Sequence, residues 1–305
     1  MITFLARRVL SSIVALAGVM VIVFFLARLT GSPANLYLPE EASEEAIRQF
    51  NENYGLNDPI WVQFARFVGD TLRLDFGDSI RQQRPAIEAV LAVFPHTLSL
   101  ALVAMICAIV ISVVLGCLAA FYSFKLVDRL ITVSSLTTAS IPDFWFALVG
   151  ILFFAVQLGV LPTSGTGSAA SWILPVATLI LAPVGVLTQV VRGAMIDAMN
   201  SGYIQNARAR GFGQNRLLFR HGLRNAALPI ITVAGDRAVG MINGAIIVDT
   251  VFAWPGVGGL IVRSVLDRDF AVIQAGVFVI GVAVILFNIL IDLTYALVDP
   301  RVRVS

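Results

Sequence analysis

Residues 89–124 read AVLAVFPHTLSLALVAMICAIVISVVLGCLAAFYSF, a run of 36 residues without an aspartate, glutamate, lysine or arginine. A helix needs about 20 predominantly apolar residues to cross the hydrocarbon core of a bilayer, so this run is long enough for a span. Residues 144–191 form a second uncharged run, of 48 residues, and must turn within themselves. The loop-forming sequence PTSGTG at 162–167 supplies that turn. The two runs indicate a protein that crosses the bilayer several times.

The composition of the whole chain agrees with this class. Of its 305 residues, 58% are hydrophobic and 13% are charged, whereas a soluble domain carries about 25% charge. This excludes a disordered chain, a nucleic-acid-binding module and most soluble enzymes. The net charge of +2 is too small to indicate a polyanionic partner.

The apolar pattern predicts an all-α polytopic membrane protein with six transmembrane helices. The expected spans are 9–29, 96–122, 131–159, 173–191, 226–248 and 271–298. The first has an apolar core of about 19 residues, longer than that of a signal peptide, and we expect an uncleaved anchor. The sequence SIPD at 140–143 predicts a break inside the third span.

The positions of arginine and lysine predict the orientation. More than half of these residues lie in the segments 1–8, 123–130, 192–225 and 299–305, which alternate with the expected outer segments. Because basic residues favour the cytoplasmic side, we expect both termini to be cytoplasmic. The outer segment 30–95 opens with several glutamates.

The segment 192–225 is the longest expected cytoplasmic piece. Its sequence predicts a helix from Tyr203 that ends at Gly211, and a second short helix over 214–224 with Arg216, Arg220 and Arg224 on one face. Two interpretations stay open at this point. The helices dock into another protein, or they lie at the membrane surface with their arginines at anionic headgroups.

The outer segment 30–95 is patterned rather than a bare linker. It predicts an acidic helix over 44–53 and an amphipathic helix over 61–72, with Trp61, Phe64, Phe67 and Val68 on its apolar face. We expect a small helical cap that contacts an extracytoplasmic partner. The alternative is a self-packed lid without a partner.

The chemistry of an enzyme is missing from the sequence. The chain has no G-x-x-x-x-G-K-[ST] loop for ATP, and its two histidines, His96 and His221, are expected on opposite sides of the membrane. We therefore expect no catalytic residue, no metal site and no cofactor in this chain.

A series of motifs resembles one family. The sequences YIQNARARG at 203–211 and HGLRNAALP at 221–229 look like the cytoplasmic coupling segment of ABC importer permeases of the dipeptide/oligopeptide/nickel family. YGLNDP at 54–59, LDFGDS at 74–79, IPDFW at 141–145, FAWPGVG at 252–258 and DPR at 299–301 resemble other blocks of that family, in the usual order. The resemblance covers nearly the whole chain.

The resemblance implies a type I ABC importer fold, with 1–305 as one transmembrane permease domain, 30–95 as an extracytoplasmic helical insertion and 192–225 as the coupling-helix segment. Such a permease sits in the inner membrane of a bacterium beside a second homologous permease. Two cytoplasmic ATPases, which bind ATP and Mg²⁺, drive it, and an extracytoplasmic solute-binding protein delivers substrate. The family's E-A-A-x-x-x-G pattern is met at Ala207 and Gly211, whereas Gln205 and Asn206 stand in place of its first two residues. The residues expected to couple to the ATPases are Tyr203, Ala207, Arg208, Arg210, Gly211, Arg216 and Arg220.

Three further groups of residues are of functional interest. Asp236 and Arg237 fall near mid-bilayer in the fifth span, where charges are unfavourable, and are expected either in a structural ion pair or, with Asn243, on the translocation path. Being adjacent on a helix, the two need not pair with each other. Trp254 and Pro255 mark an expected external turn near the outer gate, and Arg66 is expected to contact the binding protein.

Three functions are compatible with the sequence. The first is an ATP-driven importer permease for di- or oligopeptides, and the second is the same machinery for nickel or a metal–chelator complex. The spans carry no His, Cys and carboxylate cluster for bare Ni²⁺, which favours peptides. The third is a channel or membrane scaffold that works without ATPases. This function leaves the arginine-rich segment 192–225 unexplained.

Overall fold

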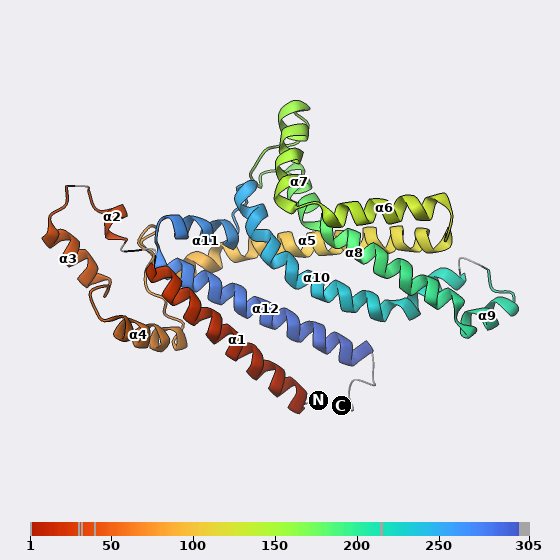
Figure 1. Cartoon of the computed structure of the whole chain (residues 1–305), viewed down its shortest axis with the longest axis horizontal. Helices are drawn as coiled ribbons and strands as arrows, with labels where there is room; N and C mark the ends of the chain where they lie inside the picture. Colours follow the sequence, from red (N-terminus) through yellow and green to blue (C-terminus); the bar gives the residue numbers. More distant parts are fainter. Residues whose placement is uncertain (1, 30, 32, 40, 214–215, 299–305) are drawn as a thin grey trace. The chain divides into compact units, whose positions relative to one another are not determined.

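A computed structural model describes residues 2–29, 31, 33–39, 41–213 and 216–298, without the side chains of 2–6, 35, 220 and 295–298. The described chain is helical (Figure 1). It divides into two compact units, one formed by Leu98–Trp254 with Phe287 onward and the other by Ile2–Thr97 with Pro255–Leu286. The helices are α1 (Ile2–Leu29), α2 (Ala34–Tyr37), α3 (Glu44–Asn53), α4 (Ile60–Leu72), α5 (Ala86–Phe121), α6 (Leu126–Ser140), α7 (Asp143–Gly150), η1 (Ile151–Gln157), η2 (Ala169–Trp172), α8 (Ile173–Asn200), α9 (Gly202–Ala209), η3 (Arg216–Gly222), α10 (Leu223–Val251), α11 (Val257–Leu266) and α12 (Phe270–Val298).

The expected spans correspond to long apolar helices. Within the described residues, five helices are long and apolar enough to cross a membrane, and α6 with α7–η1 makes a sixth if the bent pair is counted as one span. The prediction of a polytopic all-α protein is confirmed. The helices α8 and α10 extend beyond the expected spans, to Asn200 and from Leu223 respectively.

The third expected span, 131–159, needs correction. It begins five residues earlier, at Leu126, and its two helical arms meet at an angle of 99°. The bend lies at the expected break, where Pro142 has no N–H to donate and Ile141 is extended, with φ −80° and ψ 126°. The second arm passes from α7 into the π-helical segment η1, which the sequence pattern did not predict.

The first unit is organised around α8, which packs against α6 and α10. Leu187, Val248 and Trp254 lie in its main buried cluster. Two glycines on facing helices allow close backbone approach. A Cβ on Gly185 of α8 would overlap the Ser135 carbonyl oxygen of α6, and a Cβ on Gly116 of α5 would lie 2.5 Å from the Val191 Cβ of α8.

The second unit holds the segment 30–95 and confirms both helices expected there. Ser43 accepts a hydrogen bond from the Ala46 N–H at 3.2 Å and caps α3, whose first turn carries Glu44 and Glu45 beside the positive end of the helix dipole. The residues Phe64 and Phe67 of α4 pack against Phe24 of α1, at 5.4 and 5.0 Å between ring centroids. Trp61 is 70% exposed, so the expected apolar face of α4 is only partly covered.

Candidate functional site: the α9–η3 segment

The first part of the expected coupling segment is a short helix closed by glycine. After Asn200 the chain turns at Ser201 and forms α9, which ends at Ala209. Gly211 has φ +80°, a conformation that side chains with a Cβ rarely adopt. The Phe212 N–H donates to the Ala207 carbonyl at 3.3 Å, and the Gly211 N–H to the Arg208 carbonyl at 3.0 Å. The prediction of a helix that ends at this glycine is confirmed.

The second part of the segment differs from the expectation. The separate helix predicted over 214–224 is instead the π-helical segment η3, which runs directly into α10 at Leu223. The expected face of three arginines assumed 3.6 residues per turn, and a π-helix has more. The guanidinium of Arg216 lies over the Phe212 ring at 4.7 Å, whereas Arg224 is exposed. The side chain of Arg220 lies outside the described residues.

Side chains from both arms hold the segment together. Ile204 and Ala207 of α9 and Leu217 of η3 are buried against one another. The Tyr203 hydroxyl and the His221 Nδ1 share a hydrogen bond of 2.8 Å, and the Phe212 ring stacks on the His221 ring at 5.8 Å. We call the whole of 201–222 the α9–η3 segment. Its contacts make it a compact projection rather than two independent helices.

The exposed side of this segment is mainly polar and basic, with the Phe219 ring also exposed. Tyr203 is 56% exposed, and Arg208, Arg210 and Arg216 are exposed as well. Ala207 is buried, so it packs within the segment and presents no surface. Together with Gly211, these exposed residues form the accessible surface of the segment.

A buried ion pair lies on the helix that leads into this segment. The Arg192 Nε of α8 donates to the Asp128 Oδ1 of α6 at 2.5 Å, and the Arg192 Nη2 donates to Oδ2 at 2.8 Å. Asp128 also accepts the Phe124 N–H at 2.9 Å and is 3% exposed. We did not single out either residue from the sequence. The sequence signal for this pair is the opposite charge of the two residues in two segments that are both expected on the cytoplasmic side of the membrane.

The candidate residues of α10 lie on its surface in this chain. Asp236, Arg237 and Asn243 are all exposed. The Arg237 Nε lies 3.7 Å from the Asp236 Oδ2, so the two do contact each other, with exposed side-chain fractions of 44% and 75%.

The external candidates differ in accessibility. Trp254 is 1% exposed and meets the Trp172 ring edge-on at 4.7 Å, so it has no surface for a partner. Pro255, the next residue, is exposed. Arg66 of α4 is half exposed, and its Nη2 donates to the Asp58 Oδ2 at 2.7 Å.

Several long apolar helices, two of them joined by the α9–η3 segment, define a multi-pass membrane protein. Two family descriptions match the chain. Residues 112–304 match the binding-protein-dependent transport system inner membrane component, and residues 1–101 match the N-terminal part of the same kind of component. The chain therefore belongs to the family of binding-protein-dependent transport system inner membrane components.

Relatives of similar length support this assignment. The chain is 39% identical to the oligopeptide transport system permease protein AppB of Bacillus subtilis, over 99% of this chain and 100% of that protein. It is 33% identical to the dipeptide transport system permease protein DppB of Alkalihalophilus pseudofirmus, with the same coverage of 99% and 100%. It is 34% identical to the glutathione transport system permease protein GsiC of Escherichia coli K12, over 99% of both chains.

Solved structures agree on the fold. The inward-facing MetNI methionine ABC transporter matches with a TM-score of 0.56 at 16% identity, over 69% of this chain and 96% of that chain. An amino acid ABC transporter solved with histidines matches with a TM-score of 0.52 at 19% identity, over 68% and 92%. The chain is a multi-pass inner-membrane permease subunit of an ABC importer. A permease subunit of this family is not itself an enzyme, and no cofactor is expected in it.

Proposed function

We propose that the chain forms one half of the translocation pathway of a peptide importer. In this proposal it pairs with a second homologous permease and with two cytoplasmic ATPases, and it receives substrate from an extracytoplasmic binding protein. The whole segment 1–305 acts as the permease domain, with 30–95 as the outer insertion. Support for the peptide substrate comes from the relatives, whose names refer to oligopeptides, dipeptides and glutathione, itself a tripeptide. Those names favour peptides over a metal–chelator complex.

The orientation is part of the proposal. Both termini and the α9–η3 segment are cytoplasmic, and the insertion with α2, α3 and α4 is external. The excess of arginine and lysine in the segments assigned to the inside supports this orientation. The same orientation places the exposed arginines of the α9–η3 segment where the ATPases are.

The α9–η3 segment is the observation that carries the proposal. Closure of two ATPases around ATP moves the permease only if the contact between them transmits force without deforming. The buried cluster around Ile204 and Leu217, together with the bond between Tyr203 and His221, makes the segment stiff. Because α8 leads into the α9–η3 segment and η3 continues into α10, a displacement of the segment is passed to these two long helices. The charged surface of Arg208 and Arg210 suits docking into a groove of another protein.

Two further roles belong to the proposal. Asp236, Arg237 and Asn243 lie on the translocation path, facing the second permease, where they meet the charged termini of a peptide. Their exposure in the single chain supports this, because a charge at that depth faces a protein partner or water rather than lipid. At the external face, Pro255 and Arg66 contact the binding protein, whereas Trp254 is buried and makes no such contact.

Substitution of one glycine tests the coupling role. Valine at Gly211 would have to adopt φ +80°, which is unfavourable by about 1–3 kcal/mol, although no atom of the described residues lies within 4 Å of the added Cβ. We expect the Gly211→Val chain to insert and assemble, and to uncouple ATP hydrolysis from peptide uptake in proteoliposomes. Gly213→Val is the matched control, because Gly213 has no positive φ and equally open surroundings. Normal coupled uptake by Gly211→Val would contradict the proposal.

A further inference from the structure

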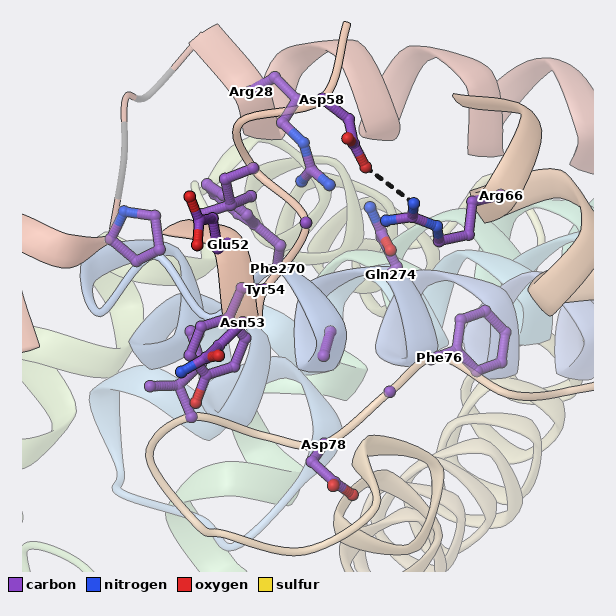
Figure 2. Close-up of a pocket in the computed structure, with 16 residues that line it drawn as sticks. Arg28, Glu52, Asn53, Tyr54, Asp58, Arg66, Phe76, Asp78, Phe270 and Gln274 are labelled. Atoms are coloured by element: carbon purple, nitrogen blue, oxygen red, sulfur yellow. Dashed lines mark hydrogen bonds and ion pairs between the residues drawn. The ribbon is translucent and has the colours of Figure 1, made fainter. Parts of the chain in front are cut away.

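The second unit contains a pocket of about 470 Å³ (Figure 2). It lies between the end of α1, the segment 52–58, α4, the segment 76–80 and the start of α12. Ligand pockets of proteins typically measure about 300–1,000 Å³, so this one has room for a small molecule. In the proposed orientation it opens to the outer solution. Its lining carries charges of both signs.

One wall of the pocket holds an arginine with an unused donor. The Arg28 guanidinium lies over the rings of Phe24 and Phe270, at 4.9 and 4.7 Å, and its Nε donates to the Gln63 Oε1 at 2.8 Å. Gln63 is itself fixed, because its amide donates to the Leu56 and Asp58 carbonyls. The Arg28 Nη1 is buried and has no hydrogen-bond partner within the described chain. A guanidinium with a buried, unpaired N–H favours an anion as its ligand.

A second unused donor lies in the same pocket. Gln274 of α12 is 6% exposed, and its Nε2 is buried without a hydrogen-bond partner among the described residues. A buried donor left unpaired is unfavourable, and a ligand oxygen that accepts from it would recover that free energy. Arg28, Arg66 and Gln274 also line an adjoining cavity of about 200 Å³. The three residues therefore lie at one end of the pocket, as Figure 2 shows.

Carboxylates also belong to the lining: Glu52, Asp58 and Asp78 line the larger pocket, and Asp70 and Asp75 line the adjoining cavity. Glu52 and Asp78 line the larger pocket but not the adjoining cavity, and Figure 2 shows Asp78 away from Arg28 and Gln274. Asp58 is engaged by Arg66 at 2.7 Å. The lining thus offers unpaired donors for an anionic group at Arg28 and Gln274, and carboxylates for a cationic group, of which Glu52 and Asp78 belong to the larger pocket alone.

We propose that this pocket binds a short zwitterionic peptide, with its terminal carboxylate at Arg28 and Gln274 and its terminal ammonium toward Glu52 and Asp78. The proposal rests on the proposed function, which it deepens by naming a substrate site on the outer insertion. Such a site would hold the peptide as the binding protein releases it, before the peptide enters the membrane path.

Equilibrium binding to the full chain in nanodiscs, without the binding protein, tests the site. The probes are radiolabelled dialanine, dialanine amide, which lacks the carboxylate, and N-acetyl-dialanine, which lacks the ammonium. We expect saturable binding of dialanine, and a loss of about ten- to hundredfold for each blocked probe, the range expected when a charge-assisted hydrogen bond is removed. Equal binding of dialanine and its amide would overturn the proposal, as would the absence of saturable dialanine binding up to millimolar concentration.

Substitutions place the site. Gln274→Glu keeps the shape of the side chain and repels a carboxylate, and Arg28→Met removes the charge; each should weaken dialanine binding at least tenfold. Arg84→Met is the matched control, because Arg84 is exposed, its guanidinium donates to the Gln82 Oε1, and it lines neither the pocket nor the adjoining cavity. Circular dichroism checks folding, and the isosteric Gln274→Glu variant decides if Arg28→Met does not fold. Unchanged binding by folded Gln274→Glu would overturn the proposal.

The failure of this proposal is distinguishable from failure of the proposed function. ATP-driven uptake by the wild-type assembly, combined with unchanged dialanine binding and uptake for Gln274→Glu, would overturn the pocket alone. If Gln274→Glu instead weakens docking of the substrate-free binding protein while wild-type nanodiscs bind no dialanine, the pocket receives a carboxylate of that protein and the peptide site is refuted.

Discussion

The ion pair between Asp128 and Arg192 allows a quantitative test of how α6 is held against α8. Asp128→Asn removes the charge and keeps an oxygen that accepts the Phe124 N–H, so the substitution isolates the pair. Breaking a buried pair by removing one partner destabilises a protein by about 3–5 kcal/mol. The Arg192 side chain is 25% exposed, so its charge regains some hydration when the pair is broken; the Asp128 side chain is 4% exposed. We therefore expect a loss of about 2–3 kcal/mol in the free energy of unfolding.

The assay is a double-mutant cycle in detergent. Unfolding by SDS titration of the wild type, Asp128→Asn, Arg192→Met and the double variant gives the coupling energy between the two side chains, which we expect to be about 2 kcal/mol. Asp197→Asn is the control, because Asp197 is exposed on α8, the helix that carries Arg192. A loss below about 0.5 kcal/mol for Asp128→Asn, no larger than that of an ordinary surface substitution, would refute the reasoning.

The other predictions concern packing, coupling and the translocation path. Gly185→Ala should destabilise the chain by about 1–3 kcal/mol, because the added Cβ overlaps the backbone of α6. Gly193→Ala, on the same helix α8 but in open surroundings, should be neutral or stabilising. Chemical unfolding measures both, and equal effects would contradict the close approach of α8 to α6. Tyr203→Phe removes the bond to His221 and should lower uptake per ATP hydrolysed in proteoliposomes while insertion is unchanged; an unaltered ratio would argue against a stiff coupling segment. Replacing Asp236 with Gln and Arg237 with Leu should change uptake of charged relative to neutral peptides with assembly intact, and loss of the assembly without a selective uptake defect would instead support a structural pair.

Features determined by neighbouring residues were predictable from the sequence. The acidic helix over 44–53, the helix end at Gly211 and the break at Pro142 each depend on residues within a few positions, and all three appear as expected. The long apolar runs likewise placed the spans, because a bilayer requires a minimum helix length.

Features that depend on tertiary packing were not predictable. A proline indicates where a helix breaks but does not fix the 99° angle between α6 and α7–η1. The π-helical geometry of η3 arises where the segment folds back onto α9, and the periodicity of its arginines gave no sign of it. Asp128 and Arg192 are 64 positions apart, and the pocket brings Arg28 together with Gln274 from opposite ends of the chain. A single sequence does not reveal such pairings.

Transport in a reconstituted assembly tests the central claim most directly. Proteoliposomes would contain this chain, the second permease and both ATPases, with the binding protein and labelled dipeptide on the outer side and ATP inside. The account predicts that dipeptide accumulates inside only when the ATPases, ATP and the binding protein are all present, and that the peptide-loaded binding protein stimulates ATP hydrolysis. Dipeptide flux at the same rate without the ATPases would contradict the account and identify the chain as a channel.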